Sequence, residues 1–170
     1  KFLFDKGLVP TDEYAKKLIN QGMILGMSAF AYKVVPNYQI EEKLYILELE
    51  KPLFVPNNYY KNTQGKLDKY GNTWGIVVND EDLFWNDYHY SILKKIEEIQ
   101  PDIFKEHEPN FIIQKIHVDV NMLKDGGDEL DRDKFKAWRE DYANAEFILE
   151  DGKYITGREV EKMSKSKFNI

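Results

Sequence analysis

The first apolar stretches of the chain alternate between helical and strand spacing. Thr11 follows Pro10 and has the side chain of a helix N-cap, and Gly22 is a suitable residue to end that helix. The apolar residues 22–26 that come next predict a short buried strand. A helix that leads into a short apolar strand is typical of α/β proteins.

The middle of the chain has a different pattern. Residues 44–49 predict a strand, the polar and glycine-containing segment 57–73 predicts a loop, and residues 74–78 predict another strand. Between Asp80, a candidate N-cap, and Pro101, the apolar positions have helical spacing. The residues of this apolar stripe are Phe84, Tyr88, Ile92, Ile96 and Ile99.

The clearest strand pattern covers residues 111–122, where apolar side chains at even positions alternate with polar ones at odd positions. Period two predicts a strand with one buried and one solvated face. Residues 125–128 predict a turn, and Asp131 or Asp133 is the expected cap of a short helix with Phe135, Trp138 and Tyr142 on one side. The Asp-Gly pair at 151–152 favours a type I′ hairpin turn.

Length and composition restrict the class of protein. The 170 residues, 42% of them hydrophobic and 14% aromatic, suffice for about one domain with a core and exclude a disordered chain. No apolar run approaches the roughly 20 residues of a membrane span. The absence of cysteine excludes disulfides, thiolate zinc sites and cysteine nucleophiles and agrees with a reducing compartment, so we expect the cytoplasm.

Charge is distributed unevenly along the chain. The net charge is −6, but residues 1–40 carry +2 and residues 152–170 carry +3, which leaves −11 for residues 41–151. An acidic body argues against a general nucleic-acid coat. The basic C-terminal segment permits a local anion site.

That segment contains the pentapeptide Lys162-Met163-Ser164-Lys165-Ser166. It is identical to KMSKS, one of two signatures of class I aminoacyl-tRNA synthetases. Residues 18–25 resemble the strand that precedes this motif in leucyl-tRNA synthetases, and residues 154–157 resemble the approach to it in the bacterial enzymes. A solvated Lys/Ser loop without a task is the alternative interpretation of the pentapeptide alone.

About 130 residues separate the two resembling segments, and an insertion at this point is similar to the leucine-specific domain of bacterial leucyl-tRNA synthetases. The resemblance implies an α+β chain in three parts. Residues 1–33 would end the Rossmann-like nucleotide-binding catalytic fold, residues 34–157 would form an enlarged insertion whose ends meet, and residues 158–170 would form the KMSKS loop. Residues 36–111 resemble nothing we can name and suggest a lineage-specific enlargement.

The resemblance also implies a reaction, in which leucine is activated with ATP and Mg²⁺ and then esterified to tRNA(Leu). Negative charge builds on the pyrophosphate leaving group, and lysine is a compact cation suited to phosphate oxygens. The family assigns ATP binding chiefly to Lys165, with Lys162 as a supporting charge. Ser164 and Ser166 would donate hydrogen bonds, and Met163 would pack the loop down.

The insertion of the bacterial family lies near the 3′ end of bound tRNA. This makes Arg139, Lys153 and Arg158 candidate contacts to the RNA backbone. Tyr59, Tyr60 and Tyr70 have lysines nearby and could stack on the bases of single-stranded RNA; the alternative is a mobile loop with exposed tyrosines.

Two departures from the family are visible. The motif continues with Phe168 where the family often has Gly or Asn, and Phe adopts a positive φ less readily than Gly. The second class I signature, His-X-Gly-His, is absent, since His89, His107 and His117 stand in other contexts. We therefore expect a monomeric piece of a longer polypeptide that is inactive alone.

Other readings of polar residues remain as alternatives. His117 and Asp119 share the polar face of the predicted strand, but two ligands without a third make a weak metal site. The aspartates of residues 125–133 resemble a calcium loop in composition only, without the required Gly and Glu spacing. We expect no metal site. A non-catalytic RNA-positioning module and another class I synthetase are the alternative functions.

Overall fold

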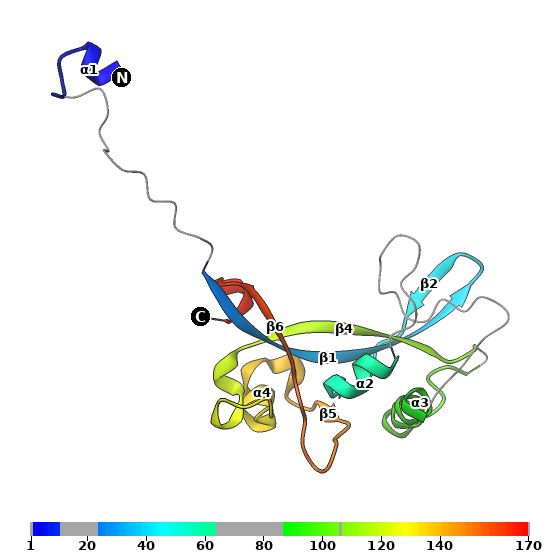
Figure 1. Ribbon diagram of the computed structural model, residues 1–170. Coiled ribbons are helices and arrows are strands. Elements are labelled where there is room, and N and C mark those ends of the chain that lie inside the picture. Colours follow the sequence, from blue (N-terminus) through cyan, green and yellow to red (C-terminus); the bar gives the residue numbers. More distant parts are fainter. Residues whose placement is uncertain (1, 11–23, 64–86, 106, 170) are drawn as a thin grey trace.

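The computed structural model describes residues 2–10, 24–63, 87–105 and 107–169 (Figure 1). The predictions for the helix from Thr11, the strand 74–78 and the Asp80 cap lie outside these residues. The helices are α1 (Phe2–Asp5), α2 (Asn57–Thr63), α3 (Asp87–Ile99) and α4 (Arg132–Trp138). The strands are β1 (Leu25–Ile40), β2 (Lys43–Ile46), β3 (Leu53–Val55), β4 (Asn110–Val118), β5 (Glu146–Phe147) and β6 (Gly157–Lys162).

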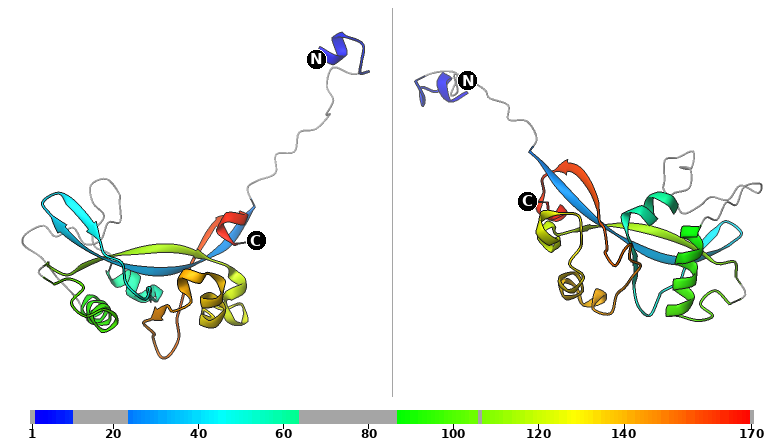
Figure 2. Two further views of the ribbon diagram at one scale, coloured as in Figure 1. Left: turned by 180° about the vertical axis from the view of Figure 1, so that it is seen from behind. Right: turned by 60° about the horizontal axis from the view of Figure 1, so that its bottom comes forward.

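Strand β1 organises the sheet, because four other strands pair with it. β2, β3, β4 and β6 are all antiparallel to β1, and β5 is parallel to β3. β6 pairs with residues 25–30 of β1 and β4 pairs with residues 29–37. Both views of Figure 2 show β1 and β4 as long twisted neighbours. The predicted α+β class is confirmed.

The two faces of β1 contribute to two separate hydrophobic clusters. Ala29 and Ala31 join a cluster with aromatic residues of the α4 region, whereas Phe30, Tyr32 and Val34 join a cluster with α3. The sequence predicted a short strand at 22–26; residues 22 and 23 lie outside the described residues, and the predicted end at residue 26 is wrong. The strand runs from Leu25 to Ile40 and is buried in its middle on both faces, so it lacks the alternation that marks a half-buried strand.

Several local predictions are confirmed. α3 buries Ile92 and Ile96 of the predicted stripe. Asp131 caps α4, since its carboxylate accepts hydrogen bonds from the backbone amides of Asp133 and Lys134. The ring of Phe135 in α4 stacks on the ring of Tyr142, which follows in a 3-10 helix at Glu140–Tyr142, and the two ring centroids are 5.1 Å apart.

The 151–152 turn also forms as the sequence predicts. Asp151 and Gly152 have φ values of 48° and 76°. They are therefore the two residues with positive φ that a type I′ turn requires. This hairpin leads the chain from the α4 region into β6.

Two other predictions are corrected. Residues 57–63 of the predicted loop form α2, because Tyr60 stacks on Tyr32 at 4.1 Å and tertiary packing decides the local structure. The predicted strand 111–122 ends at Val118, and residues Val120–Met122 form a 3-10 helix, η1. The Asp119 side chain caps η1, since it accepts a hydrogen bond from the backbone amide of Asn121.

The polar face of β4 is not fully solvated either. Lys115 lies over the Phe30 ring, 3.8 Å from its centroid, and the ring of His117 lies beside the same phenylalanine. None of the helices in the described part of the chain has the length and hydrophobicity needed to cross a membrane.

Candidate functional site: the KMSKS turn

Residues 162–169, which we call the motif turn, begin where β6 ends against the start of β1. Lys162 is the register partner of Leu25, and the Met163 amide donates to the Ile24 carbonyl oxygen at 2.9 Å. The first residues of the motif and the end of the segment 18–25, although far apart in the chain, therefore meet at Ile24 and Leu25. Figure 1 shows the motif turn and the C-terminus beside the first residues of β1.

A short helical segment shapes the turn. Lys165–Lys167 form the 3-10 helix η4 with Ser164 at its N-cap position, and the hydroxyls of Ser164 and Ser166 are 2.8 Å apart. Phe168 follows in the left-handed conformation with φ 51° and ψ 33°. Glycine would adopt this conformation without strain, whereas Phe costs about 1 kcal/mol. The ring of Phe168 is nearly perpendicular to the ring of Trp138, and the two ring centroids are 5.3 Å apart.

Asn169 fastens the turn to the sheet. Its side chain is buried, donates to the Ser28 hydroxyl at 2.9 Å and accepts from the Ser164 amide at 2.9 Å. A Cβ on Gly26 would stand 2.4 Å from the Asn169 carbonyl oxygen, so only glycine allows this close approach. The Phe168 carbonyl oxygen accepts from the Val120 amide at 3.3 Å.

Glu161, the residue before the motif, provides a second anchor. Its carboxylate accepts from Lys167 Nζ at 2.7 Å and lies 2.8 Å from His117 Nε2. Hydrogen bonds from Lys167 first, and from Ser28 and His117 after it, lower the pKa of Glu161 to about 2. The carboxylate is therefore ionised throughout the physiological range and neutralises Lys167.

Lys162 and Lys165 differ from Lys167, because their ammonium groups have no carboxylate partner in the described part of the chain. Both side chains are exposed, and neither forms an ion pair with any residue that the structure describes. The structure thus presents two unneutralised cations on a turn whose backbone is fixed by Asn169 and Glu161. Such an arrangement can bind an oxyanion that carries several negative charges.

Comparison with known proteins finds relatives of a single kind among the most similar ones. Leucine–tRNA ligase of Christiangramia forsetii is 37% identical over 170 residues, which cover 100% of this chain and 11% of the relative. The ligases of Flavobacterium psychrophilum and Porphyromonas gingivalis are 38% and 36% identical over 172 and 170 residues. The chain is homologous to a small part of bacterial leucine–tRNA ligases. It spans about a tenth of their length.

The aligned length covers the whole chain, so it includes residues 36–111, which the sequence alone did not relate to any family. No family model and no solved structure matches the chain.

The three candidate RNA contacts of this ligase-like segment do not form one cluster. Lys153 and Arg158 both lie against the turn at 127–129, where Lys153 Nζ is 3.9 Å from Glu129 and Arg158 Nε is 3.7 Å from Asp128. Arg139 instead pairs with Asp141 at 3.2 Å, and its guanidinium lies 5.0 Å from the centre of the Tyr142 ring.

Tyr59 and Tyr60, considered for base stacking, are partly buried against the α3 cluster, where Tyr59 contacts the ring of Tyr88 and Tyr60 stacks on Tyr32. Stacking on RNA bases would require these ring contacts to be given up. Tyr70 lies outside the described residues.

The metal alternatives do not gain a third ligand. His117 contacts Glu161, and the Asp119 carboxylate caps η1, so the two side chains serve different partners. Among the described residues, no group of three or more His, Asp or Glu side chains is placed to hold a metal ion.

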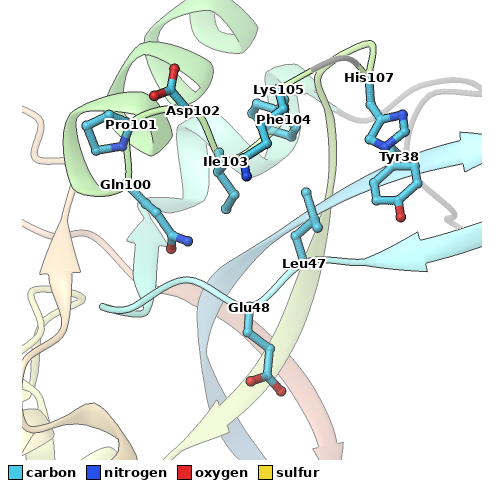
Figure 3. A pocket seen from close by; sticks show the side chains of 10 residues that line it. All are labelled: Tyr38, Leu47, Glu48, Gln100, Pro101, Asp102, Ile103, Phe104, Lys105 and His107. Carbon is cyan, nitrogen blue, oxygen red and sulfur yellow. The ribbon is translucent and has the colours of Figure 1, made fainter.

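A groove of about 460 Å³ lies elsewhere in the molecule (Figure 3). Its walls include Tyr38 and His107, whose rings stack 3.9 Å apart, and Leu47 and Ile103. Tyr38 belongs to the far end of β1, about 40 Å from Leu25 along an extended strand. None of the predicted site residues lines this groove.

Sequence reasoning identified the two free lysines but not the residues that hold the turn. Glu161 and Lys167 flank the motif directly, so their charges were available as a signal. The contributions of Ser28, His117 and Asn169 depend on strand pairing and could not be read from local sequence.

Proposed function

We propose that this chain is the part of a leucine–tRNA ligase that carries the KMSKS turn, with Lys165 and Lys162 binding the phosphates of ATP during leucine activation. The observation that supports this proposal is the pair of exposed, unneutralised ammonium groups on an anchored turn. The parent enzyme would join leucine to tRNA(Leu), in the cytoplasm. All the leading relatives are leucine–tRNA ligases, which favours leucine over the substrates of other class I synthetases.

The chemistry of the turn follows from its charges. When the leucine carboxylate attacks the α-phosphate, negative charge accumulates on the departing pyrophosphate, and Lys165 and Lys162 stabilise it. Lys167 is already neutralised by Glu161, so it holds the turn and adds little to the field at the phosphates. The hydroxyls of Ser164 and Ser166 add hydrogen-bond donors between the two lysines.

Residues 162–169 contain no carboxylate, and the carboxylate of the neighbouring Glu161 is already held by Lys167, Ser28 and His117. Mg²⁺, which neutralises phosphate charge when bound, prefers to keep water and phosphate ligands. We therefore propose that Mg²⁺ is held by the phosphates and by other parts of the enzyme.

Residues 1–33 would belong to the catalytic fold, residues 34–157 to the insertion and residues 158–170 to the KMSKS loop. β1 runs through residue 33 without interruption, so the proposed insertion continues a strand of the catalytic part. The pairing of Phe30 with Gly157 brings the end of the insertion back to within a few residues of its start, as a domain inserted into another fold requires.

The proposal is tested by leucine-dependent ATP–pyrophosphate exchange in the full-length polypeptide. We expect Lys165→Ala to lower kcat/KM for ATP by about 100-fold, the typical loss when one donor to a developing negative charge is removed. Lys94→Ala is the matched control, because Lys94 is an exposed lysine on α3 without an ion pair among the described residues. Equal exchange rates in the two variants would refute the proposal.

The 170-residue chain alone should show no leucine-dependent exchange, because the His-X-Gly-His signature is not in it. Exchange above a heat-inactivated blank would show that the chain contains a complete activation site.

A second role concerns tRNA. Lys153 and Arg158 both lie against the turn at 127–129, and we propose that they and Arg139 contact the tRNA backbone. Replacing Lys153 and Arg158 by Ala should lower tRNA charging and leave ATP–pyrophosphate exchange unchanged. If exchange falls as far as in Lys165→Ala, the insertion does not have a separate RNA-positioning role.

A further inference from the structure

Three strands present polar side chains on the same face beneath the motif turn. The antiparallel register places His117 of β4 opposite Phe30, and Glu161 of β6 opposite Gly26. Directly opposed residues share a face of the sheet. The residue between them on β1 is the buried Ser28, whose hydroxyl accepts from Asn169 and hydrogen-bonds to Glu161.

The two oxygens of Glu161 have different partners. Oε1 accepts from Lys167 Nζ at 2.7 Å, and Oε2 lies 2.8 Å from His117 Nε2. Because a carboxylate only accepts, the His117 nitrogen carries a hydrogen in this contact. One carboxylate thus connects the motif turn to β4, a strand that is 44 residues away in sequence and belongs to the proposed insertion.

We propose that Glu161 is a positioning residue for ATP activation: it couples strand β4 of the insertion to the motif turn and thereby fixes where Lys165 presents its charge. This inference rests on the proposed function of the turn and adds a residue outside the KMSKS pentapeptide. Glu161 does not contact ATP in this scheme, and it acts only through the turn. The low pKa of Glu161 keeps the connection ionised.

A second ion pair on this face provides a comparison for Glu161. Lys115 of β4 and Glu159 of β6 form a neighbouring ion pair between the same two strands. Neither of these side chains has a polar contact with the described residues of the motif turn. The Glu159–Lys115 ion pair therefore joins β6 to β4 but does not contact Lys167. Glu159 is for this reason the matched control for Glu161.

The test uses the full-length polypeptide and steady-state ATP–pyrophosphate exchange, with ATP and leucine varied separately. We expect Glu161→Gln to lower kcat/KM for ATP by about tenfold and to leave KM for leucine within twofold, since small displacements of a positioned group are costly. Glu159→Gln should stay within twofold of the wild type for both substrates. Glu161→Asp, which keeps the charge, should recover part of the loss.

A double-mutant cycle decides whether the effect passes through Lys165. In the Lys165→Ala background, Glu161→Gln should change exchange by less than twofold, because the charge that it positions is gone. An undiminished tenfold loss in that background, equal losses in Glu159→Gln and Glu161→Gln, or a parallel rise in KM for leucine would overturn the inference.

The cycle separates this inference from the proposed function. If Lys165→Ala has no effect, the proposed function fails; if Lys165→Ala is defective but Glu161→Gln is normal, only the positioning role fails. Should Glu161→Gln not fold, Lys167→Met removes the turn side of the connection alone and carries the same expectations, including the loss of its effect in the Lys165→Ala background.

Discussion

The hydroxyl of Tyr154 connects the hairpin that leads into β6 with the middle of the sheet. Tyr154 is fully buried, and its hydroxyl donates to the Val55 carbonyl oxygen at 2.7 Å and accepts from the Tyr32 amide at 3.1 Å. Burial also raises the pKa of Tyr154, so the group stays protonated and keeps its donor. Tyr154→Phe removes both hydrogen bonds with little change in shape.

The size of the effect follows from the two partners that are left behind. Each buried group that loses its hydrogen bond costs about 1–3 kcal/mol, so we expect a loss of about 3 kcal/mol in the free energy of unfolding. For a chain of this size, 1 kcal/mol corresponds to roughly 2–4 °C, which gives a fall in Tm of about 10 °C.

Thermal unfolding followed by circular dichroism measures this difference. Tyr142→Phe is the matched control, because Tyr142 is also buried but its hydroxyl has no hydrogen bond to the described residues. We expect the control to lose less than about 0.5 kcal/mol. Equal changes in Tm for the two variants would show that the Tyr154 hydroxyl does not hold the hairpin to the sheet.

Three further predictions concern the motif turn and its hairpin. Gly26→Ala places a Cβ 2.4 Å from the Asn169 carbonyl oxygen and should lower ATP–pyrophosphate exchange in the full-length polypeptide, whereas Gly127→Ala, with its nearest contact at 3.4 Å, should not. The lowered pKa of Glu161 stabilises the fold above the ordinary carboxyl pKa of 4.5, so the Tm difference between wild type and Glu161→Gln should be full at pH 7 and should disappear as the pH falls towards 2. Gly152→Ala, at φ 76°, should cost about 1 kcal/mol in chemical denaturation, and an unchanged midpoint would contradict the type I′ assignment.

Features that depend on neighbouring residues were predictable from the sequence. The Asp-Gly turn, the Asp131 cap and the apolar stripe of α3 each involve residues within a few positions of one another. The KMSKS pentapeptide likewise marked the two lysines that the structure leaves exposed and unneutralised. Local conformational preference decides such features, so their signal lies in a short segment of sequence.

Features that depend on packing were not predictable. β1 is buried on both faces, and α2 forms because Tyr60 stacks on Tyr32, 28 positions earlier in the chain. The anchors of the motif turn are still more distant, since Asn169 and Ser28 are 141 residues apart. Phe168 is a different case: the sequence flagged it as unsuited to a positive φ, and the structure places it there with φ 51°.

The central claim is that Lys162 and Lys165 lie at the phosphates of ATP. It is tested most directly by labelling the full-length polypeptide with an ATP analogue that carries an amine-reactive aldehyde on its terminal phosphate, followed by peptide mapping. The account predicts a label on Lys165 or Lys162 that excess ATP with leucine prevents. A protected label on other lysines, with these two unmodified, would contradict it.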